Sequence, residues 1–239
     1  MKTINKILLW TAAMVMVLAF ALPAAADVTV YAEGAYTADD LVVYVYADIN
    51  TDAICSAGVK LTYDNTKLTV DSAVKNDAVW YMGDGTTNQT YMDPEDAGDG
   101  VIIICGKLDT NNPTAGVIGD RVLLGIVTFN RDDVGAVPTD PADAETYFGV
   151  TVELGRGGDF ANFVTVAAGT EIDDVVVFDG AIVRERGDAN ADGSITNNDR
   201  AKVRDFIFSD MYVCYADANK DGRITNNDRA WIRDMIFNQ

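Results

Sequence analysis

Apolar and polar positions alternate along most of the chain with the period of two residues that is typical of β-strands. Nine segments with this alternation, or with a short β-branched and aromatic run, lie between residues 27 and 186, separated by clusters of Gly, Asp, Asn and Pro. They cover residues 28–31, 41–46, 59–63, 68–70, 101–105, 122–129, 150–152, 163–166 and 175–178. No amphipathic pattern of helical length interrupts them. This region is therefore predicted to be mainly β, a jelly-roll-like antiparallel β-sandwich of about nine strands in two sheets.

The pattern changes to helical spacing in the last part of the chain. Two apolar stripes there have the i, i+3, i+4 spacing of an amphipathic helix. Their residues are Val203, Phe206 and Ile207 in the first stripe and Trp231, Ile232, Met235 and Ile236 in the second. Each stripe follows a capping-box pattern, in which Thr196 precedes Asp199 and Thr225 precedes Asp228 by three residues. Two short helices, each preceded by a loop, are therefore predicted.

The two loop–helix segments are copies of each other. Residues 188–208 align with residues 217–237 at an offset of 29, and 16 of the 21 aligned positions are identical. Each copy reads D-A-N-x-D-G-x-I-T-N-N-D-R-A-x-x-R-D-x-I-F. Its first twelve residues have the oxygen-ligand spacing of a calcium loop, with the glycine that the sharp turn requires at position 6. The sequence therefore predicts two Ca²⁺ ions as cofactors.

Positions 1, 3, 5, 7, 9 and 12 of each loop supply the expected calcium ligands. These residues are Asp188, Asn190, Asp192, Ser194, Thr196 and Asp199 in the first loop, and Asp217, Asn219, Asp221, Arg223, Thr225 and Asp228 in the second. Ser194 and Arg223 are expected to use their backbone carbonyls. Two features differ from a standard EF-hand pair: position 12 is Asp instead of Glu, and a predicted strand, not a helix, precedes the first loop.

This duplicated pattern closely resembles type I-like dockerin modules over residues 187–239. Dockerins are paired calcium loop–helix repeats that bind cohesins. The resemblance implies that loop positions 10 and 11 and the helix arginines recognise the partner. These residues are Asn197, Asn198, Arg200 and Arg204 in the first repeat and Asn226, Asn227, Arg229 and Arg233 in the second. A solvated helix face is the alternative role of the arginines. The near-symmetry also suggests, as a hypothesis, two binding orientations related by 180°.

The β-rich region resembles the cohesin modules that dockerins bind. Residues 56–64 followed by 67–70 look like the third and fourth cohesin strands, and residues 125–129 and 178–183 look like later ones. The implied organisation is a cohesin-like β-sandwich at 27–186 and a dockerin at 187–239, with calcium loops at 188–199 and 217–228. In cohesins the strands that would carry Cys55 and Cys105 are antiparallel neighbours. A disulfide between these cysteines is one expectation, and two buried thiols are the alternative.

Residues 1–26 have the form of a secretory signal peptide. Two lysines precede an apolar run of 16 residues (7–22), which is followed by Ala24-Ala25-Ala26 as a small-residue cleavage site. The run is shorter than the roughly 20 residues that span a bilayer. The mature protein is therefore predicted to begin at Asp27, to have no membrane span after cleavage, and to be secreted or associated with the cell surface.

Composition and charge exclude several classes of function. The chain has 37 acidic and 18 basic residues, a formal net charge of −19, and no histidine. The acidic excess offers no electrostatic basis for binding nucleic acid, and the lack of histidine excludes Ser-His-Asp and Cys-His catalysis. The charge is uneven: residues 27–186 carry −19 (28 acids, 9 bases) and residues 187–239 carry −2 (9 acids, 7 bases). Two Ca²⁺ ions would bring the second region to +2, which favours association with an acidic partner.

The function predicted from these features is that of a secreted, non-catalytic adaptor or scaffold that mediates calcium-dependent cohesin–dockerin recognition. Its expected partners are cohesin- and dockerin-bearing proteins, including head-to-tail copies of itself. The alternative is a carbohydrate-binding module whose dockerin targets an assembly to polysaccharide. Trp80, Tyr81 and Tyr91 are the candidates for a sugar-stacking platform, and core packing is their other reading. A small glycosidase is a third hypothesis, for which no paired carboxylate motif is discernible.

Overall fold

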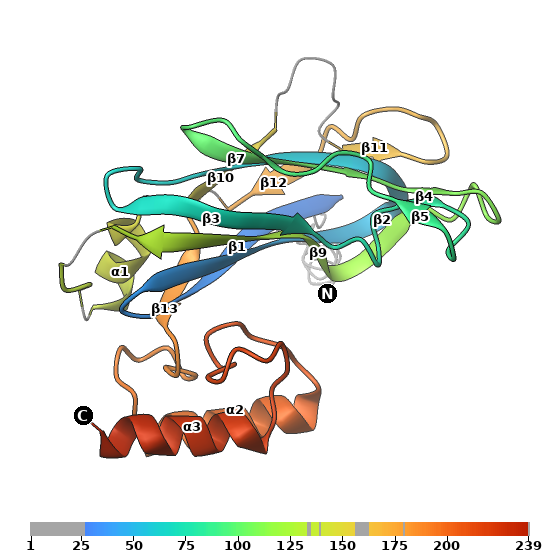
Figure 1. The fold of residues 1–239 in the computed structure, drawn as a ribbon. Helices are drawn as coiled ribbons and strands as arrows, with labels where there is room; N and C mark the ends of the chain where they lie inside the picture. The colour runs from blue at the N-terminus through green and yellow to red at the C-terminus, as the bar shows by residue number, and fades with distance from the viewer. Residues whose placement is uncertain (1–26, 133–134, 139, 156–162, 179, 239) are drawn as a thin grey trace, which may run out of the picture.

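The computed structural model describes residues 27–132, 135–138, 140–155, 163–178 and 180–238 (Figure 1). The predicted signal peptide lies outside these residues. Two separate clusters of buried apolar side chains organise the described chain, one among the β-strands and one in the C-terminal loop–helix repeats. Among the residues described, no helix is long and apolar enough to span a bilayer.

A single long strand, β2 (Asp40–Thr62), organises the β-sandwich. Its first half pairs with β1 (Val28–Tyr36) and β9 (Val117–Arg131), which forms one layer. Its second half pairs with β7 (Gly100–Gly106), β10 (Thr151–Leu154) and β11 (Phe163–Thr165), which form the other layer. The sequence pattern predicted two separate strands at 41–46 and 59–63. The structure joins them, because register irregularities between Ala47 and Ile54 let the strand bend from one layer to the other.

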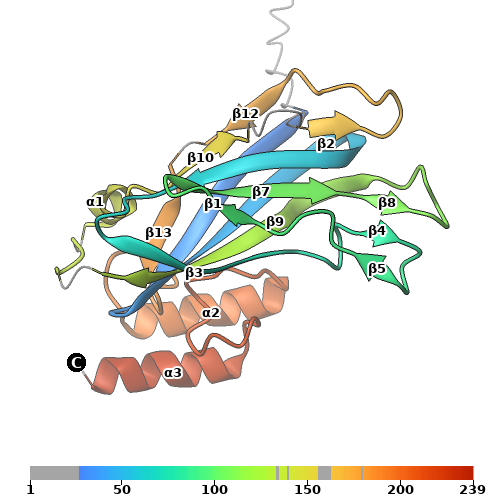
Figure 2. The ribbon, with the colours of Figure 1, turned by 45° about the horizontal axis from the view of Figure 1, so that its top comes forward.

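The remaining strands extend the two layers (Figures 1 and 2). In the first layer, β3 (Leu68–Lys75) pairs with β9, while β12 (Val175–Val177) and β13 (Ile182–Glu185) run parallel to β1. In the second, β6 (Glu95–Asp96) pairs with β7. Hydrogen bonds through β2 join ten strands into one folded-over sheet. A small separate sheet contains β4 (Met82–Gly83), β5 (Asn88–Gln89) and β8 (Leu108–Asp109). The mainly β, sandwich-like prediction is confirmed, although two independent sheets of about nine strands were expected.

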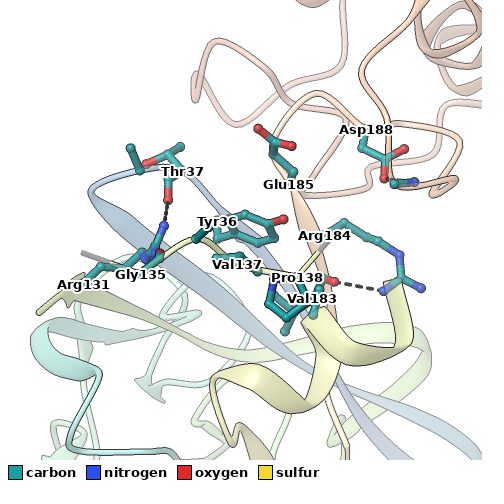
Figure 3. Close-up of a pocket in the computed structure, with 14 residues that line it drawn as sticks. Tyr36, Thr37, Arg131, Gly135, Val137, Pro138, Val183, Arg184, Glu185 and Asp188 are labelled. Atoms are coloured by element: carbon teal, nitrogen blue, oxygen red, sulfur yellow. Dashed lines mark hydrogen bonds between the residues drawn. The ribbon is translucent and has the colours of Figure 1, made fainter. Parts of the chain in front are cut away.

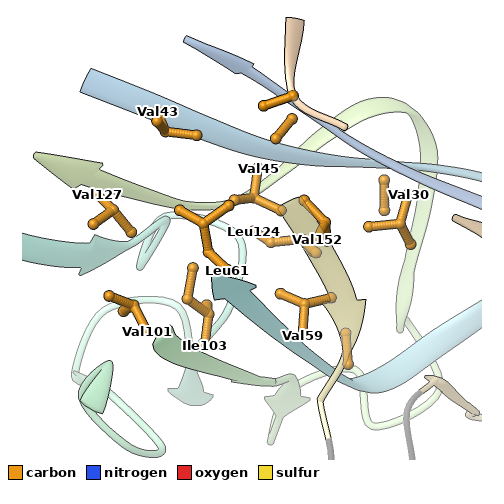
Figure 4. Close-up of a cluster of buried hydrophobic side chains, with 14 of the residues drawn as sticks. Val30, Val43, Val45, Val59, Leu61, Val101, Ile103, Leu124, Val127 and Val152 are labelled. Atoms are coloured by element: carbon orange, nitrogen blue, oxygen red, sulfur yellow. The ribbon is translucent and has the colours of Figure 1, made fainter. Parts of the chain in front are cut away.

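The core of the sandwich lies between the inward side chains of the two halves of β2 (Figure 4). Val43 and Val45 come from the first half and Val59 and Leu61 from the second, and all four are fully buried. Each buried aliphatic side chain contributes about 1.5–3 kcal/mol relative to an exposed one. Trp80 is also fully buried, and its indole N–H donates to the Leu123 carbonyl at 3.0 Å. Trp80 is therefore a core residue and cannot stack against a sugar at the surface.

One helix within the β region was not predicted from the sequence pattern. The helix α1 (Pro141–Tyr147) has only seven residues, too few to show a helical period. Its start is specified locally, because the Asp140 side chain accepts a hydrogen bond from the Ala142 N–H. An ion pair of 2.7 Å between Glu145 and Arg184 connects α1 to β13.

The two C-terminal helices form as predicted. They are α2 (Asn197–Ser209) and α3 (Asn226–Phe237), and both begin with a complete capping box. Val203, Phe206 and Ile232 are buried in the second apolar cluster. The prediction for Trp231 is wrong, because this side chain is 55% exposed. Ile232 occupies the inward position, and a residue one place along the helix points about 100° away from it.

The disulfide expectation is also wrong. Cys55 and Cys105 are free thiols, as is Cys214. The two side chains are held by different neighbours: the Cys55 thiol donates to the Thr165 carbonyl at 3.8 Å, and the Cys105 thiol donates to the Leu124 carbonyl at 3.6 Å. Cys105 lies opposite Ala57 in the ladder, so Cys55 is not its direct cross-strand partner. The alternative, buried thiols, describes Cys105, whereas Cys55 is half-buried.

Candidate calcium sites

The two twelve-residue loops have the same backbone conformation. Position 4 is left-handed in both, with φ of 59° at Ala191 and 60° at Lys220. Position 6 is left-handed as well, with φ of 82° at Gly193 and 79° at Gly222. A left-handed residue at position 6 strongly favours glycine, as the sequence pattern predicted. The near-identity of the sequences is therefore matched by near-identity of structure.

The position 1 carboxylate closes the first turn of each loop. Asp188 accepts hydrogen bonds from the backbone N–H groups of Asp192 at 3.1 Å and Gly193 at 2.9 Å. Asp217 accepts the equivalent bonds, from residues 221 and 222, at the same distances. These bonds turn the carboxylate toward the inside of the loop.

The position 12 carboxylate joins the two ends of each loop. Asp199 accepts from the backbone N–H of Asn190 at 2.9 Å and from that of Thr196 at 2.7 Å. Asp228 accepts in the same way from positions 3 and 9 of the second loop, at 3.3 and 2.7 Å. Position 12 thus has two tasks, because it also completes the capping box that starts the helix.

Four carboxylates are buried in the two loops. Asp188 and Asp217 are 1% exposed, and Asp199 and Asp228 are fully buried. None of the four takes part in the ion pairs found among the described residues. Burial raises the pKa of Asp188 and that of Asp228. A buried carboxylate without a counter-charge is costly, so each loop fits a bound cation that its oxygen donors can coordinate.

The other predicted ligands lie at the rims of the loops. Asp192 is exposed, and its carboxylate accepts from the Ser194 N–H at 3.0 Å and from the Asn190 amide at 2.8 Å. Asp221 makes the same contacts with Arg223 and Asn219. In the described part of the chain no three acidic or cysteine side chains gather closely enough to hold a metal ion. The structure thus brings positions 1 and 12 inward and leaves position 5 turned toward the rim.

Several predicted partner-binding residues hold one another on the helix surface. Arg200 donates to the Asn197 side chain at 2.9 Å, and Arg229 donates to the equivalent Asn226 at 3.0 Å. The second asparagine of each pair, Asn198 or Asn227, is exposed. Arg204 and Arg233 are also exposed, and each pairs with the aspartate that follows it. The repeats therefore present two nearly equivalent polar surfaces.

Sequence reasoning missed an exposed aromatic residue at the end of each repeat. Phe208 is 82% exposed and Phe237 is 80% exposed. They occupy the same repeat position, one residue beyond the apolar stripe that packs inward. That offset was the available signal, because successive residues of an α-helix point about 100° apart, which turns a residue just beyond the stripe away from it. Trp231, which lies on α3, is a third exposed aromatic side chain in the repeats.

A cleft of about 350 Å³ lies between the first twelve-residue loop and the sandwich (Figure 3). Tyr36 lies in its centre, and Glu185 and Asp188 are on the loop side. Burial raises the pKa of Tyr36 to about 12, and burial together with the charge of Asp188 raises the pKa of Glu185. Arg131 on the sandwich side donates to the Thr37 carbonyl at 2.7 Å. The first loop therefore lies directly beside the sandwich and lines this cleft together with it.

Comparison with known proteins found solved structures only. No family model matches the chain, and no curated protein sequence matches it. The sixth cohesin from Acetivibrio cellulolyticus scaffoldin B, in complex with a Cel5 dockerin mutant, has a TM-score of 0.42 and 16% identity over 66% of this chain and 96% of its own. A non-cellulosomal cohesin from the archaeon Archaeoglobus fulgidus has a TM-score of 0.40 and 16% identity, over 67% of this chain and 91% of its own. The solution structure of CaCohA2 from Clostridium acetobutylicum has a TM-score of 0.40 and 14% identity, over 69% of this chain and 94% of its own. All three similarities are weak.

Proposed function

We propose that the protein is a secreted, non-catalytic adaptor whose C-terminal repeat, residues 187–239, binds two Ca²⁺ ions and docks on a cohesin-bearing partner. The observation that carries this proposal is the pair of loops with matching backbone angles and hydrogen bonds. Each loop has two buried carboxylates, and none of the four is ion-paired among the described residues. Turn formation alone does not need buried carboxylates at positions 1 and 12 in both copies. A cation in each loop would account for them.

Calcium binding needs a small rearrangement of each loop. A bound Ca²⁺ supplies positive charge that neutralises the inward carboxylates and ties the loop to its helix. Positions 1 and 12 already face inward, as described above for Asp188 and Asp199. Asp192 would leave the Ser194 N–H and turn inward, and Asp221 would do the same in the second loop. Both residues are exposed, so this movement displaces no packed side chain.

The proposed recognition surface consists of the exposed side chains that the two repeats share. It contains Asn198 and Asn227, the arginines Arg204 and Arg233, and the aromatic residues Phe208 and Phe237. Exposed aromatic and arginine side chains are the types most often found at the energetic centre of protein interfaces. Because both copies present the same chemistry, either one is suited to the same partner surface.

The sandwich is proposed to be a cohesin-like module that binds dockerins. Its net charge of −19 (28 acids, 9 bases) complements a calcium-loaded repeat of +2. Complementary charge of this kind increases the rate of encounter and contributes to specificity. The proposed partners are therefore dockerin-bearing proteins for the sandwich and cohesin-bearing proteins for the repeat.

Most of the sugar-stacking platform expected for the carbohydrate-binding alternative is not available at the surface. Trp80 is buried, and the ring of Tyr81 is covered by the Lys107 amine at 3.3 Å from the ring centre. The Tyr81 hydroxyl is also engaged, donating to Asp109 at 3.0 Å. Of the three candidate rings, Tyr91 is the exposed one, at 40%. One exposed ring makes a poor stacking surface, which favours the protein-recognition proposal.

Chelation tests the proposed function. The mature chain, starting at Asp27, is titrated with Ca²⁺ after treatment with EDTA, and its binding to a cohesin is measured in both states. Loss of helical circular dichroism and of cohesin binding on chelation, with recovery on adding Ca²⁺, is the expected result. A helical signal and a dissociation constant that stay the same in excess EDTA would overturn the proposal. Binding of the isolated sandwich to cellulose or xylan, without binding to any dockerin, would favour the carbohydrate alternative.

A further inference from the structure

The two calcium loops are not in equivalent surroundings, although their sequences and backbones are. We infer that the sandwich is a docking platform for the second loop, residues 217–228, so that Ca²⁺ binding by this loop and its seating on the sandwich strengthen each other. The inference rests on the proposed calcium binding and goes beyond it, because it assigns the sandwich an effect on one ion site and not on the other.

A tyrosine pair forms the centre of the contact. The Tyr212 hydroxyl lies 3.0 Å from the Tyr44 hydroxyl on β2 and 3.0 Å from Oδ2 of Asp217, the position 1 ligand of the second loop. The two rings are tilted with centroids 5.7 Å apart. A hydroxyl has one hydrogen, and a carboxylate only accepts. The Tyr212 hydroxyl therefore donates its hydrogen to the Asp217 carboxylate, which cannot donate. The Tyr44 hydroxyl then donates to the Tyr212 oxygen. A sandwich residue thus helps to orient a calcium ligand.

Arg121 fixes the backbone of Tyr212 from the sandwich side. Its guanidinium donates to the Tyr212 carbonyl at 3.1 Å while lying 4.5 Å from the centre of the Tyr46 ring. A bidentate pair with Glu33 orients the same guanidinium, at 2.8 and 2.9 Å. Groups already held in place lose little conformational entropy when they bind. The platform is therefore preorganised.

Arg186 connects the sandwich to the start of the second loop. It follows β13 directly, and its backbone N–H donates to the Tyr36 carbonyl on β1 at 2.9 Å. Its buried guanidinium donates to the backbone carbonyl of Asp217 at 2.6 Å and to that of Cys214 at 3.3 Å. Position 1 of the second loop is thus held through its side chain by Tyr212 and through its backbone by Arg186.

An ion pair connects the second loop itself to the sandwich. Lys220, at position 4 of the second loop, pairs with Asp40 at the start of β2. The first loop has Ala191 at position 4, which has no charge to pair. The residue that stands 29 positions before Tyr212 is Val183, which is buried in the sandwich core. The first loop therefore has no equivalent of either contact, although it follows β13 closely.

Linkage makes the effect reciprocal. Contacts that hold the second loop in its ligand geometry raise its Ca²⁺ affinity, and a bound ion then stabilises the same contacts by an equal free energy. Removing one hydrogen bond or one partly exposed ion pair is expected to reduce the Ca²⁺ affinity of the second loop about three- to tenfold. The first loop is expected to keep its affinity.

Hydrogen–deuterium exchange of the mature full chain during a Ca²⁺ titration tests the inference, because it follows residues 188–199 and 217–228 separately. The test variants are Tyr44→Phe and Lys220→Ala. Tyr31→Phe is a control, since the Tyr31 hydroxyl bonds Asp48 within the sandwich. Lys202→Ala is the second control, an exposed lysine of α2. In the test variants the protection midpoint of the second loop should move to a three- to tenfold higher Ca²⁺ concentration, with the first loop unchanged. Both controls should match the wild type.

The outcomes separate the two proposals. Equal shifts of both loops, or no shift of either, would overturn the docking inference and leave calcium binding intact. A wild-type chain whose loops gain no protection from Ca²⁺ would overturn the proposed function and the inference with it. A second readout checks reciprocity: EDTA should increase exchange at residues 212–216 in the wild type, and unchanged exchange there would contradict the coupling.

Discussion

The guanidinium of Arg121 forms a bidentate ion pair with the carboxylate of Glu33, at nitrogen–oxygen distances of 2.8 and 2.9 Å. Arg121 is a left-handed residue, with φ of 50°, so the chain accepts backbone strain at this position to place the side chain. Glu33 is only 8% exposed. The pair lies on the outer face of the β1–β2–β9 layer, where it supports the C-terminal repeat.

Removing Arg121 alone should destabilise the protein strongly. Arg121→Ala leaves the Glu33 carboxylate nearly buried without its partner, and we expect a loss of about 2–4 kcal/mol in the free energy of unfolding. The double variant Arg121→Ala with Glu33→Gln should recover part of this loss, because it removes the unpaired charge. Urea denaturation measures both. A single variant within about 0.5 kcal/mol of the wild type would contradict the role of the pair.

Each of the two position 12 aspartates should be required for the binding of one Ca²⁺ ion. Asp228→Ala removes an inward carboxylate and the capping box of α3 together, so calorimetry should show one bound Ca²⁺ in place of the proposed two. Asp205→Ala, which removes an exposed carboxylate of α2, is the control and should leave the stoichiometry unchanged. Retention of two ions in Asp228→Ala would exclude position 12 as a ligand of the second loop.

The three thiols should differ in reactivity. Burial raises the pKa of Cys105 to about 12, so almost none of it is thiolate at pH 8. Cys214 is also buried, and burial raises its pKa as well. Native protein treated with iodoacetamide should therefore be modified first at the half-buried Cys55, and all three should react after unfolding without reductant. Mass spectrometry of the peptides checks this order. A missing thiol in the unfolded, non-reduced protein would indicate a disulfide.

Acid should remove the contribution of one turn residue. Hydrogen bonds from Thr66, then Lys67, lower the pKa of Asp64 to about 2 from an ordinary 3.8. A depressed folded-state pKa adds stability above the unfolded pKa, and this stability is lost as the pH falls from about 4 to about 2. Asp64→Asn should therefore be less stable than the wild type at pH 6, and most of this difference should be gone at pH 2, where about half of the Asp64 carboxyl is protonated in the folded state. Chemical denaturation at both values measures the difference, and an equal gap at both would contradict the assignment.

The repeat symmetry predicts redundancy in partner binding. Replacing Asn226 and Asn227 by alanine should change the affinity for a cohesin by less than about threefold, because the first repeat presents the same residues. Replacing Asn197 and Asn198 as well should lower it by about tenfold or more, since no intact copy remains. Biolayer interferometry with the single and double sets provides the comparison. A tenfold loss from one set alone would show that only one orientation is used.

The local features of the fold were predictable from the chain because their causes are local. The capping boxes at Thr196 and Thr225 depend on residues three positions apart, and the left-handed glycines depend on a fixed place in a repeat. Strand positions such as 101–105 and 122–129 follow from short apolar runs rich in β-branched residues and bounded by turn residues. All these signals fall within a few residues, so a single sequence is sufficient to detect them.

The remaining features depend on contacts between distant residues. The continuity of β2 was missed, because residues 47–58 alternate poorly and pair with partners as remote as Gly119 and Phe163. The contact between Tyr44 and Tyr212 joins residues 168 positions apart. Neither residue carries a local pattern that predicts the other. The outward direction of Trp231 was likewise decided by which side of α3 faces the repeat core.

The continuous strand β2 has a mechanical consequence. Hydrogen bonds from one 23-residue segment hold both layers of the sandwich, so neither layer can separate while β2 remains paired. The C-terminal repeat is attached to this sheet through β13, which pairs with β1, and through the ion pair between Lys220 and Asp40 at the start of β2. We therefore expect the two layers to unfold together, in one cooperative transition.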